Sequence, residues 1–228
     1  VNWTLLQFDR GLDFSAIAKV SPNIWYMATW WDAKILKTTN AGLSCDTTYT
    51  YTYGPTRLKF INELTGFGVC KYTDFIKTTD GGQNWSVTSP FGSQNWALDF
   101  IDENTGYAGG SEAYKTTNGG LSWETISLGN ENYYTADIQF INSNRGFIAS
   151  FVGASAGIVL KTTDGGLNWG ATTLGNYYLS DIYFIDEQIG FAMNNYALFK
   201  TTDGGSSWFE LRTCTNNAMM VAYFNDTL

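Results

Sequence analysis

Histidine is absent from this 228-residue sequence, which removes the commonest general base and the commonest metal ligand. Lys and Arg number only 13 against 21 Asp and Glu, so the formal net charge is −8. A protein that binds nucleic acid normally carries a basic stripe along its phosphate contacts. We therefore expect no metal site, no cofactor and no nucleic-acid partner.

Long apolar runs and prolines are also scarce. No stretch of about eighteen apolar residues occurs, although a membrane-spanning helix would need one, so we expect no insertion into a membrane. Three prolines stand against 24 glycines, a balance that suits many tight turns between strands. Because 44% of the residues are hydrophobic and 15% are charged, the chain has ample material for a core.

The three cysteines, Cys45, Cys70 and Cys214, are far apart and odd in number. They form neither a CxxC pair nor a zinc-binding spacing. We interpret each as a small buried side chain, with a disulfide as the alternative.

A nine-residue motif recurs along the whole chain. Lys77–Trp85 reads KTTDGGQNW, and close copies begin at Lys115, Lys161 and Lys200. A degraded copy begins at Lys37 and ends in Cys where the others end in Trp. The period of about forty residues is typical of repeat architectures.

A second motif follows the same period: an aromatic residue, a polar turn, then glycine and another aromatic, as in Phe100–Tyr107. Each unit reads as four short strands, which we name A to D in chain order. For one unit, the predicted strands cover residues 97–101, 106–109, 113–116 and 122–126. Four strands in each period predict an all-β fold, a β-propeller of four-stranded antiparallel blades.

The two chain ends match parts of one further unit. Residues 1–6 resemble a D strand, and residues 219–228 resemble an A strand with its turn. We expect a single propeller domain over residues 1–228, with five complete repeats and a split or incomplete sixth. The chain is then a piece of a longer protein or has an atypical closing blade, and a five-bladed ring with two extra edge strands is the alternative. The complete units end near Cys45, Trp85, Trp123, Trp169 and Trp208.

The turn between strands C and D has a structural explanation. An Asp or Asn at its first position accepts hydrogen bonds from backbone N–H groups two and three residues on, and the following Gly-Gly supplies positive φ. The Trp after the turn covers it and the neighbouring sheet. We predict structural roles for both sets. The turn residues are Asn40, Asp80, Asn118, Asp164 and Asp203, and the tryptophans are Trp85, Trp123, Trp169 and Trp208.

The T-x-D-G-G-x-x-W pattern resembles the Asp-box, or BNR, repeat of sialidases, sortilin-like receptors and xyloglucan hydrolases. The longer pattern, F-I-D-x-x-x-G-[FY]-A followed by K-T-T-D-G-G-x-x-W, looks most like the branch that holds photosystem II assembly factors and secreted Bacteroidetes proteins. This resemblance covers the whole chain and implies a β-propeller. It implies a bacterial protein that is secreted or on the cell surface, and it says little about activity.

The sequence favours a binding or scaffold module over an enzyme. The sialidase resemblance implies three converging arginines, and the chain has only four, scattered along it. The assembly-factor resemblance implies a basic docking patch, which an acidic chain without arginine clusters does not provide. A glycoside hydrolase is the alternative, because acids such as Asp32, Asp74 and Glu112 could form a catalytic pair.

One rim of the predicted blades is the candidate binding surface. The A–B and C–D turns belong to one rim, while the B–C loops and D–A connections form the other, which is rich in non-repeating aromatic residues. Such rings suit a glycan or a protein partner, and packing between blades is their alternative role. We expect Trp30, Trp31 and Tyr72 to be the main anchors. The full candidate set is Trp30, Trp31, Asp32, Tyr72, Asp74, Glu112, Tyr133, Tyr134, Phe151, Tyr177 and Tyr178.

Overall fold

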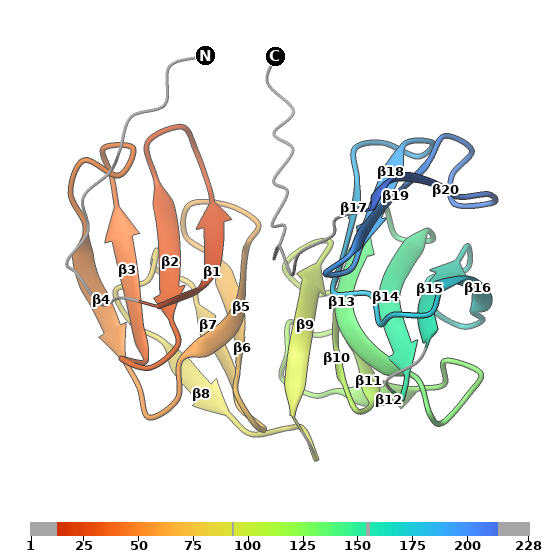
Figure 1. The fold of residues 1–228 in the computed structure, drawn as a ribbon. Helices are drawn as coiled ribbons and strands as arrows, with labels where there is room; N and C mark the ends of the chain where they lie inside the picture. The colour runs from red at the N-terminus through yellow and green to blue at the C-terminus, as the bar shows by residue number, and fades with distance from the viewer. Residues whose placement is uncertain (1–12, 93, 154–155, 214–228) are drawn as a thin grey trace. The chain divides into compact units, whose positions relative to one another are not determined.

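The structure is a computed structural model that describes residues 13–92, 94–153 and 156–213. These residues form twenty strands in five four-stranded antiparallel sheets (Figure 1). Every sheet keeps the chain order of its strands, so each is one repeat unit, here termed blades 1 to 5. The prediction of five complete four-stranded units is confirmed. The predicted partial unit at residues 1–6 and 219–228 lies outside the described residues.

The chain divides into two compact units, Val1–Gly106 with Thr116–Trp123 and Tyr107–Lys115 with Glu124–Leu228. Blades 1 and 2 belong to the first unit and blades 4 and 5 to the second, while the strands of blade 3 are shared between them. The single domain expected over residues 1–228 stays a prediction. In the part of the chain that the structure describes, no helix is long and apolar enough to cross a membrane.

The strand bounds follow the repeat closely. Blade 1 holds β1 (Phe14–Lys19), β2 (Trp25–Thr29), β3 (Lys34–Thr38) and β4 (Asp46–Thr50). Blade 2 holds β5 (Pro55–Phe60), β6 (Gly66–Cys70), β7 (Phe75–Thr78) and β8 (Ser86–Thr88). Blade 3 holds β9 (Asn95–Phe100), β10 (Gly106–Gly110), β11 (Ala113–Thr116) and β12 (Glu124–Ile126). Blade 4 holds β13 (Tyr134–Phe140), β14 (Gly146–Val152), β15 (Ala156–Thr162) and β16 (Gly170–Gly175). Blade 5 holds β17 (Asp181–Phe184), β18 (Gly190–Met193), β19 (Ala197–Thr201) and β20 (Phe209–Thr213).

The core lies along the middle strands. All residues of β6 and β10 are buried, whereas β8 and β12, at the outer edges of their sheets, are mostly exposed. Strand D begins one residue after the repeated tryptophan and not at it, so each tryptophan lies at the end of the C–D turn.

Aromatic stacking joins consecutive blades and explains the second sequence motif. The aromatic residue near the start of one B strand lies face to face with the aromatic residue that ends the next A strand, at centroid distances of 3.6–3.8 Å. The glycine that opens strand B is needed as well, because a Cβ on Gly66 would lie 2.4 Å from the Phe60 ring. The stacked pairs are Tyr26–Phe60, Phe67–Phe100, Tyr107–Phe140 and Phe147–Phe184.

The repeated tryptophans occupy matching places in four blades. Each indole meets the phenylalanine that ends strand A edge-on, at 5.9–6.0 Å and 87–89°. Trp85 is 9% exposed, and the other three are half-buried. Blade 1 has the smaller, half-buried Cys45 at this position. The contacting pairs are Trp85–Phe60, Trp123–Phe100, Trp169–Phe140 and Trp208–Phe184.

The C–D turns bond differently in detail from the sequence expectation. Asp164 Oδ1 accepts the N–H groups of Leu167 and Asn168, three and four residues on, at 3.1 and 2.9 Å. The N–H two residues on belongs to Gly166 and donates to Thr162 Oγ1 instead, at 3.0 Å. The same buried threonine hydroxyl donates to Asp164 Oδ1 at 2.8 Å. The threonine two residues before the acid is therefore a second part of the clamp, which sequence reasoning missed.

The turn acids are strongly acidic because of these bonds. Hydrogen bonds from the side chain and backbone of Asn168 lower the pKa of Asp164 to about 2. Asn84 does the same in blade 2, where its backbone and side chain lower the pKa of Asp80 to about 2. A carboxylate held ionised as a hydrogen-bond acceptor is poorly suited to donate a proton in catalysis.

Exchanging partners within one turn tests this bonding pattern. Asn168 Nδ2 donates to Asp164 Oδ2 at 2.8 Å, whereas in blade 3 the order is reversed and Asn118 Nδ2 donates to Ser122 Oγ at 2.8 Å. Asp164→Asn alone replaces the carboxylate by a neutral amide and removes the charge-assisted hydrogen bonds that Asn168 donates to it, so we expect a lower melting temperature. Adding Asn168→Ser reproduces the blade 3 pair and should restore most of the loss in thermal denaturation followed by circular dichroism. If the single variant melts like the wild type, the carboxylate is not a clamp.

The repeated lysines link one blade to the next turn. Lys37 Nζ donates to Gly81 O at 2.9 Å, Lys77 Nζ to Gly119 O at 3.0 Å and Lys115 Nζ to Gly165 O at 2.8 Å. The hydroxyl of Tyr26 donates to the same Gly81 oxygen at 2.7 Å. These ammonium groups thus stabilise the contact between neighbouring blades.

Candidate functional site

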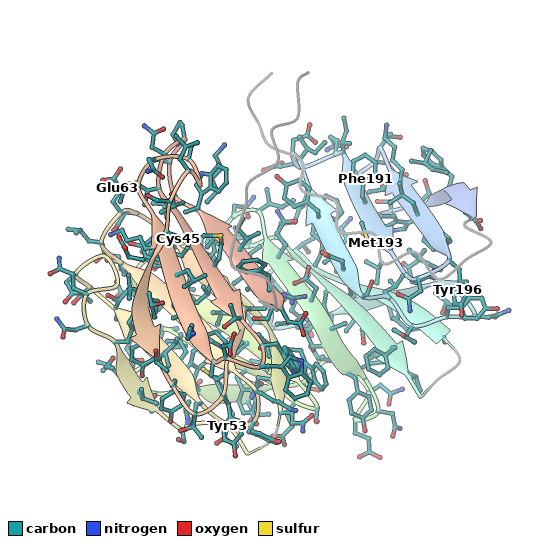
Figure 2. All side chains as sticks on the ribbon, turned by 60° about the vertical axis from the view of Figure 1, so that its left-hand side comes forward. Cys45, Tyr53, Glu63, Phe191, Met193 and Tyr196 are labelled. Carbon is teal, nitrogen blue, oxygen red and sulfur yellow. The ribbon has the colours of Figure 1, made fainter. Side chains whose placement is uncertain are left out.

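A pocket of about 300 Å³ opens in the first unit among the loops of blades 1 and 2. Its residues come from the β2–β3 loop, the β4–β5 connection and the β6–β7 loop, all on the rim predicted to bind. Figure 2 shows Tyr53 at the opposite end of these sheets from Glu63, which lies in an A–B turn. The pocket is lined by Trp30, Trp31, Thr52, Tyr53, Gly54, Lys71 and Tyr72.

Aromatic rings dominate this pocket and face solvent. Trp31 is 77% exposed, and Tyr53 and Tyr72 are 45% and 39% exposed, while Trp30 is half-buried. Tyr53 and Tyr72 meet edge-to-face, with centroids 4.8 Å apart. Large aromatic side chains left open on loops that join firmly paired strands are typical anchors for a ligand. The structure thus brings the three expected anchors, Trp30, Trp31 and Tyr72, together.

The backbone around the pocket is strained. Tyr72 has a φ of 86° and Ala33, next to the tryptophan pair, a φ of 51°. A left-handed backbone costs a residue with a bulky side chain about 1–2 kcal/mol. Gly54 permits a close approach, because a Cβ there would lie 2.0 Å from Thr29 O. Strain of this kind persists at binding sites, where the position of a side chain matters more than local stability.

Tyr72→Asn tests whether this strain serves binding. Asn tolerates the left-handed region, so relief of strain should offset the lost ring contact. We expect the free energy of unfolding to stay within about 1 kcal/mol of the wild type in urea denaturation. Ligand binding should weaken. A loss of stability well above that margin would instead make Tyr72 a packing residue.

The predicted acids do not line the pocket. Asp74 accepts hydrogen bonds from Tyr51 Oη at 2.9 Å and Ser89 Oγ at 2.5 Å, and the first of these raises the pKa of Tyr51 to about 12. Glu112 accepts a hydrogen bond from the hydroxyl of Tyr114. Asp32 is exposed beside Trp31 and is not part of the lining. Asp74 and Glu112 therefore hold local structure.

The other predicted aromatics form a separate cluster in the second unit. Tyr134 stacks on Phe151 at 5.3 Å and 10°, and Phe151 contacts Tyr178 at 5.7 Å. Asn195 Nδ2 donates to Tyr178 Oη at 3.1 Å. Tyr177, which is 51% exposed, pairs with Tyr196 at 4.4 Å, and Figure 2 labels Tyr196 at the blade 5 B–C loop. Tyr133 is half-buried.

Metal and thiol chemistry find no support in the described residues. No group of three or more Cys, Asp or Glu there could hold a metal ion. Cys70 is a buried free thiol, so Cys45 and Cys70 do not form the alternative disulfide with each other, and Cys214 lies outside the described residues. Burial raises the pKa of the Cys70 thiol to about 12, which keeps it protonated and weakly nucleophilic at neutral pH.

No family model matches the sequence, and no curated protein is similar enough in sequence to match. Solved structures do match. A GH74 xyloglucanase from Xanthomonas campestris aligns with a TM-score of 0.71 at 13% identity, over 87% of this chain and 38% of that chain. The GH74 enzyme of Niastella koreensis aligns with a TM-score of 0.68 at 18% identity, over 88% of this chain and 38% of that chain. YCF48 bound to a D1 peptide aligns with a TM-score of 0.51 at 14% identity, over 90% of this chain and 84% of that chain.

The chain has the β-propeller fold. It spans about two fifths of the length of the two GH74 enzymes. At these identities the likeness establishes the fold alone, and the fold accommodates both enzymes and binding proteins.

Proposed function

We propose that this propeller is a non-enzymatic binding module that recognises a glycan or a protein segment in the Trp30–Tyr72 pocket. The observation that carries the proposal is the pocket itself, where four aromatic side chains line a solvent-open concavity. Rigid aromatic anchors lose little conformational entropy on binding, which favours affinity. YCF48, which has the same fold, is known with a peptide bound, and that is consistent with a propeller that serves as a binding protein.

The lining of the pocket disfavours the glycoside hydrolase alternative. Glycosidases need two carboxyl groups flanking the scissile bond. None of the seven residues that line the described pocket is Asp or Glu. The xyloglucanase likeness covers only 38% of that enzyme and therefore does not extend its activity to this chain.

The proposal also covers the cellular location of the protein and the type of its sequence repeat. The K-T-T-D-G-G-x-x-W turns are proposed to be Asp-box repeats, supported by the threonine and acid clamp around each Gly-Gly pair. A secreted or cell-surface location in a bacterium follows from that resemblance.

Binding and turnover can be compared directly. The purified chain should bind members of a combined glycan and peptide array while releasing no chromophore from a panel of chromogenic glycosides. Turnover of any glycoside by the wild-type chain would overturn the proposal. The proposal would also be overturned if the chain bound nothing on the array, or if Trp31→Ala left the array binding unchanged.

A further inference from the structure

Lys71 is the only charged residue among the seven that line the pocket. Its ammonium lies 5.5 Å from the ring centroids of both Trp30 and Tyr72. Within the described residues, no oxygen accepts a hydrogen bond from Lys71 Nζ, unlike Lys37 and Lys77, whose ammonium groups donate to backbone carbonyls at 2.9 and 3.0 Å.

An ammonium in this setting favours an anionic ligand. Both rings attract the charge of the half-buried Lys71 side chain, but an aromatic face is not a conventional acceptor for the hydrogen bonds of its ammonium group. A carboxylate entering the pocket would form a charge-assisted hydrogen bond in a medium of lower dielectric than water. Asp74, three residues along the same loop, is held by Tyr51 and Ser89 and does not line the pocket.

The remaining lining suits a sugar. Three of the lining residues, Thr52, Tyr53 and Tyr72, carry a hydroxyl group that can donate and accept hydrogen bonds, which suits a polyhydroxylated ligand. The exposed indole of Trp31 offers a flat face on which a pyranose ring can stack. A volume of about 300 Å³ lies at the small end of ligand pockets and suits one ring with its substituents.

The charge of the whole chain limits how acidic the ligand can be. A net charge of −8 repels an extended polyanion, so a polymer charged at every residue would approach against the field of the protein. A single carboxylate on an otherwise neutral glycan meets Lys71 with little of that penalty.

We propose that the pocket selects one uronic-acid residue carried on a neutral oligosaccharide, with Lys71 binding the carboxylate and Trp31 stacking on the ring. This inference rests on the proposed function, because it names the ligand class of the same pocket.

Paired ligands isolate the carboxylate. The probes are tetrasaccharides with one terminal glucuronate and their carboxyl-reduced counterparts, which end in glucose, titrated by calorimetry into the full chain. We expect the acidic member to bind at least about tenfold more tightly, as one charge-assisted hydrogen bond allows. Lys71→Met should abolish this difference while leaving weak Trp31-dependent binding of both sugars, and Lys71→Arg should retain it. Thermal melting of each variant confirms that the blades are folded.

The outcomes separate the two proposals. Equal affinity for the acidic and neutral sugars, lost in Trp31→Ala, would overturn the inference and leave the binding function standing. Discrimination that survives Lys71→Met would also overturn the inference. Binding of acidic peptides without either sugar would overturn it in favour of a protein ligand. No binding of either tetrasaccharide would overturn the inference, and only the absence of Trp31-dependent binding across the combined glycan and peptide array would overturn the proposed function as well.

Discussion

Replacing Trp85 with alanine should lower the free energy of unfolding by about 3–5 kcal/mol, the usual cost of deleting a large buried aromatic side chain. Trp85 is 9% exposed, meets Phe60 edge-on at 5.9 Å and lies 6.1 Å from the Tyr49 ring. Its removal leaves a cavity beneath the C–D turn of blade 2, because the backbone hydrogen bonds of the surrounding strands prevent them from closing the space. Urea denaturation monitored by circular dichroism measures the change.

Trp96 provides a matched control for Trp85. It lies in β9 and is 45% exposed, so Trp96→Ala removes less buried apolar surface and should lower the free energy of unfolding clearly less than Trp85→Ala does. If the two variants lose similar stability, the repeated tryptophan has no special structural role.

Trp31→Ala should weaken ligand binding at least about tenfold, or roughly 1.4 kcal/mol, and leave the melting temperature nearly unchanged. The indole is 77% exposed, so its removal costs a ligand contact and little packing. Isothermal titration calorimetry with a ligand selected on the array, paired with thermal melting, measures both effects.

Tyr177→Ala tests whether the ligand binds in the pocket or at the aromatic cluster of the second unit. Tyr177 is 51% exposed and pairs with Tyr196, so this variant removes a comparable exposed ring elsewhere. We expect its affinity to equal that of the wild type. Loss of binding in Tyr177→Ala with full binding in Trp31→Ala would move the ligand site to the cluster.

The repeat made the fold predictable. Each unit carries its own turn glycines and its own aromatic pair, so the period alone predicts four strands per blade. The strands observed in blade 3, 95–100, 106–110, 113–116 and 124–126, differ from the predicted ranges by at most two residues at either end. The turn threonine is the last residue of strand C and carries no separate signal in the sequence, although its hydroxyl accepts the N–H that the prediction assigns to the acid.

The site was less predictable because it depends on contacts between loops that are distant in sequence. Trp30, Trp31 and Tyr72 stand out as non-repeating aromatics in B–C loops. Lys71 gives no comparable signal, since it differs from the structural lysines in two features of the fold: its ammonium lies 5.5 Å from the centroids of two rings, and no oxygen of the described residues accepts a hydrogen bond from it. The positive φ of Tyr72 is also invisible in a sequence where glycine normally marks that conformation.

A crystal structure of the chain with a ligand selected on the array tests the central claim most directly. The proposed function predicts ligand density against the indole of Trp31, within reach of Lys71 and the Tyr53 and Tyr72 hydroxyls. Density on the Tyr134–Phe151–Tyr178 cluster or on the C–D turns, with the pocket empty, would contradict it.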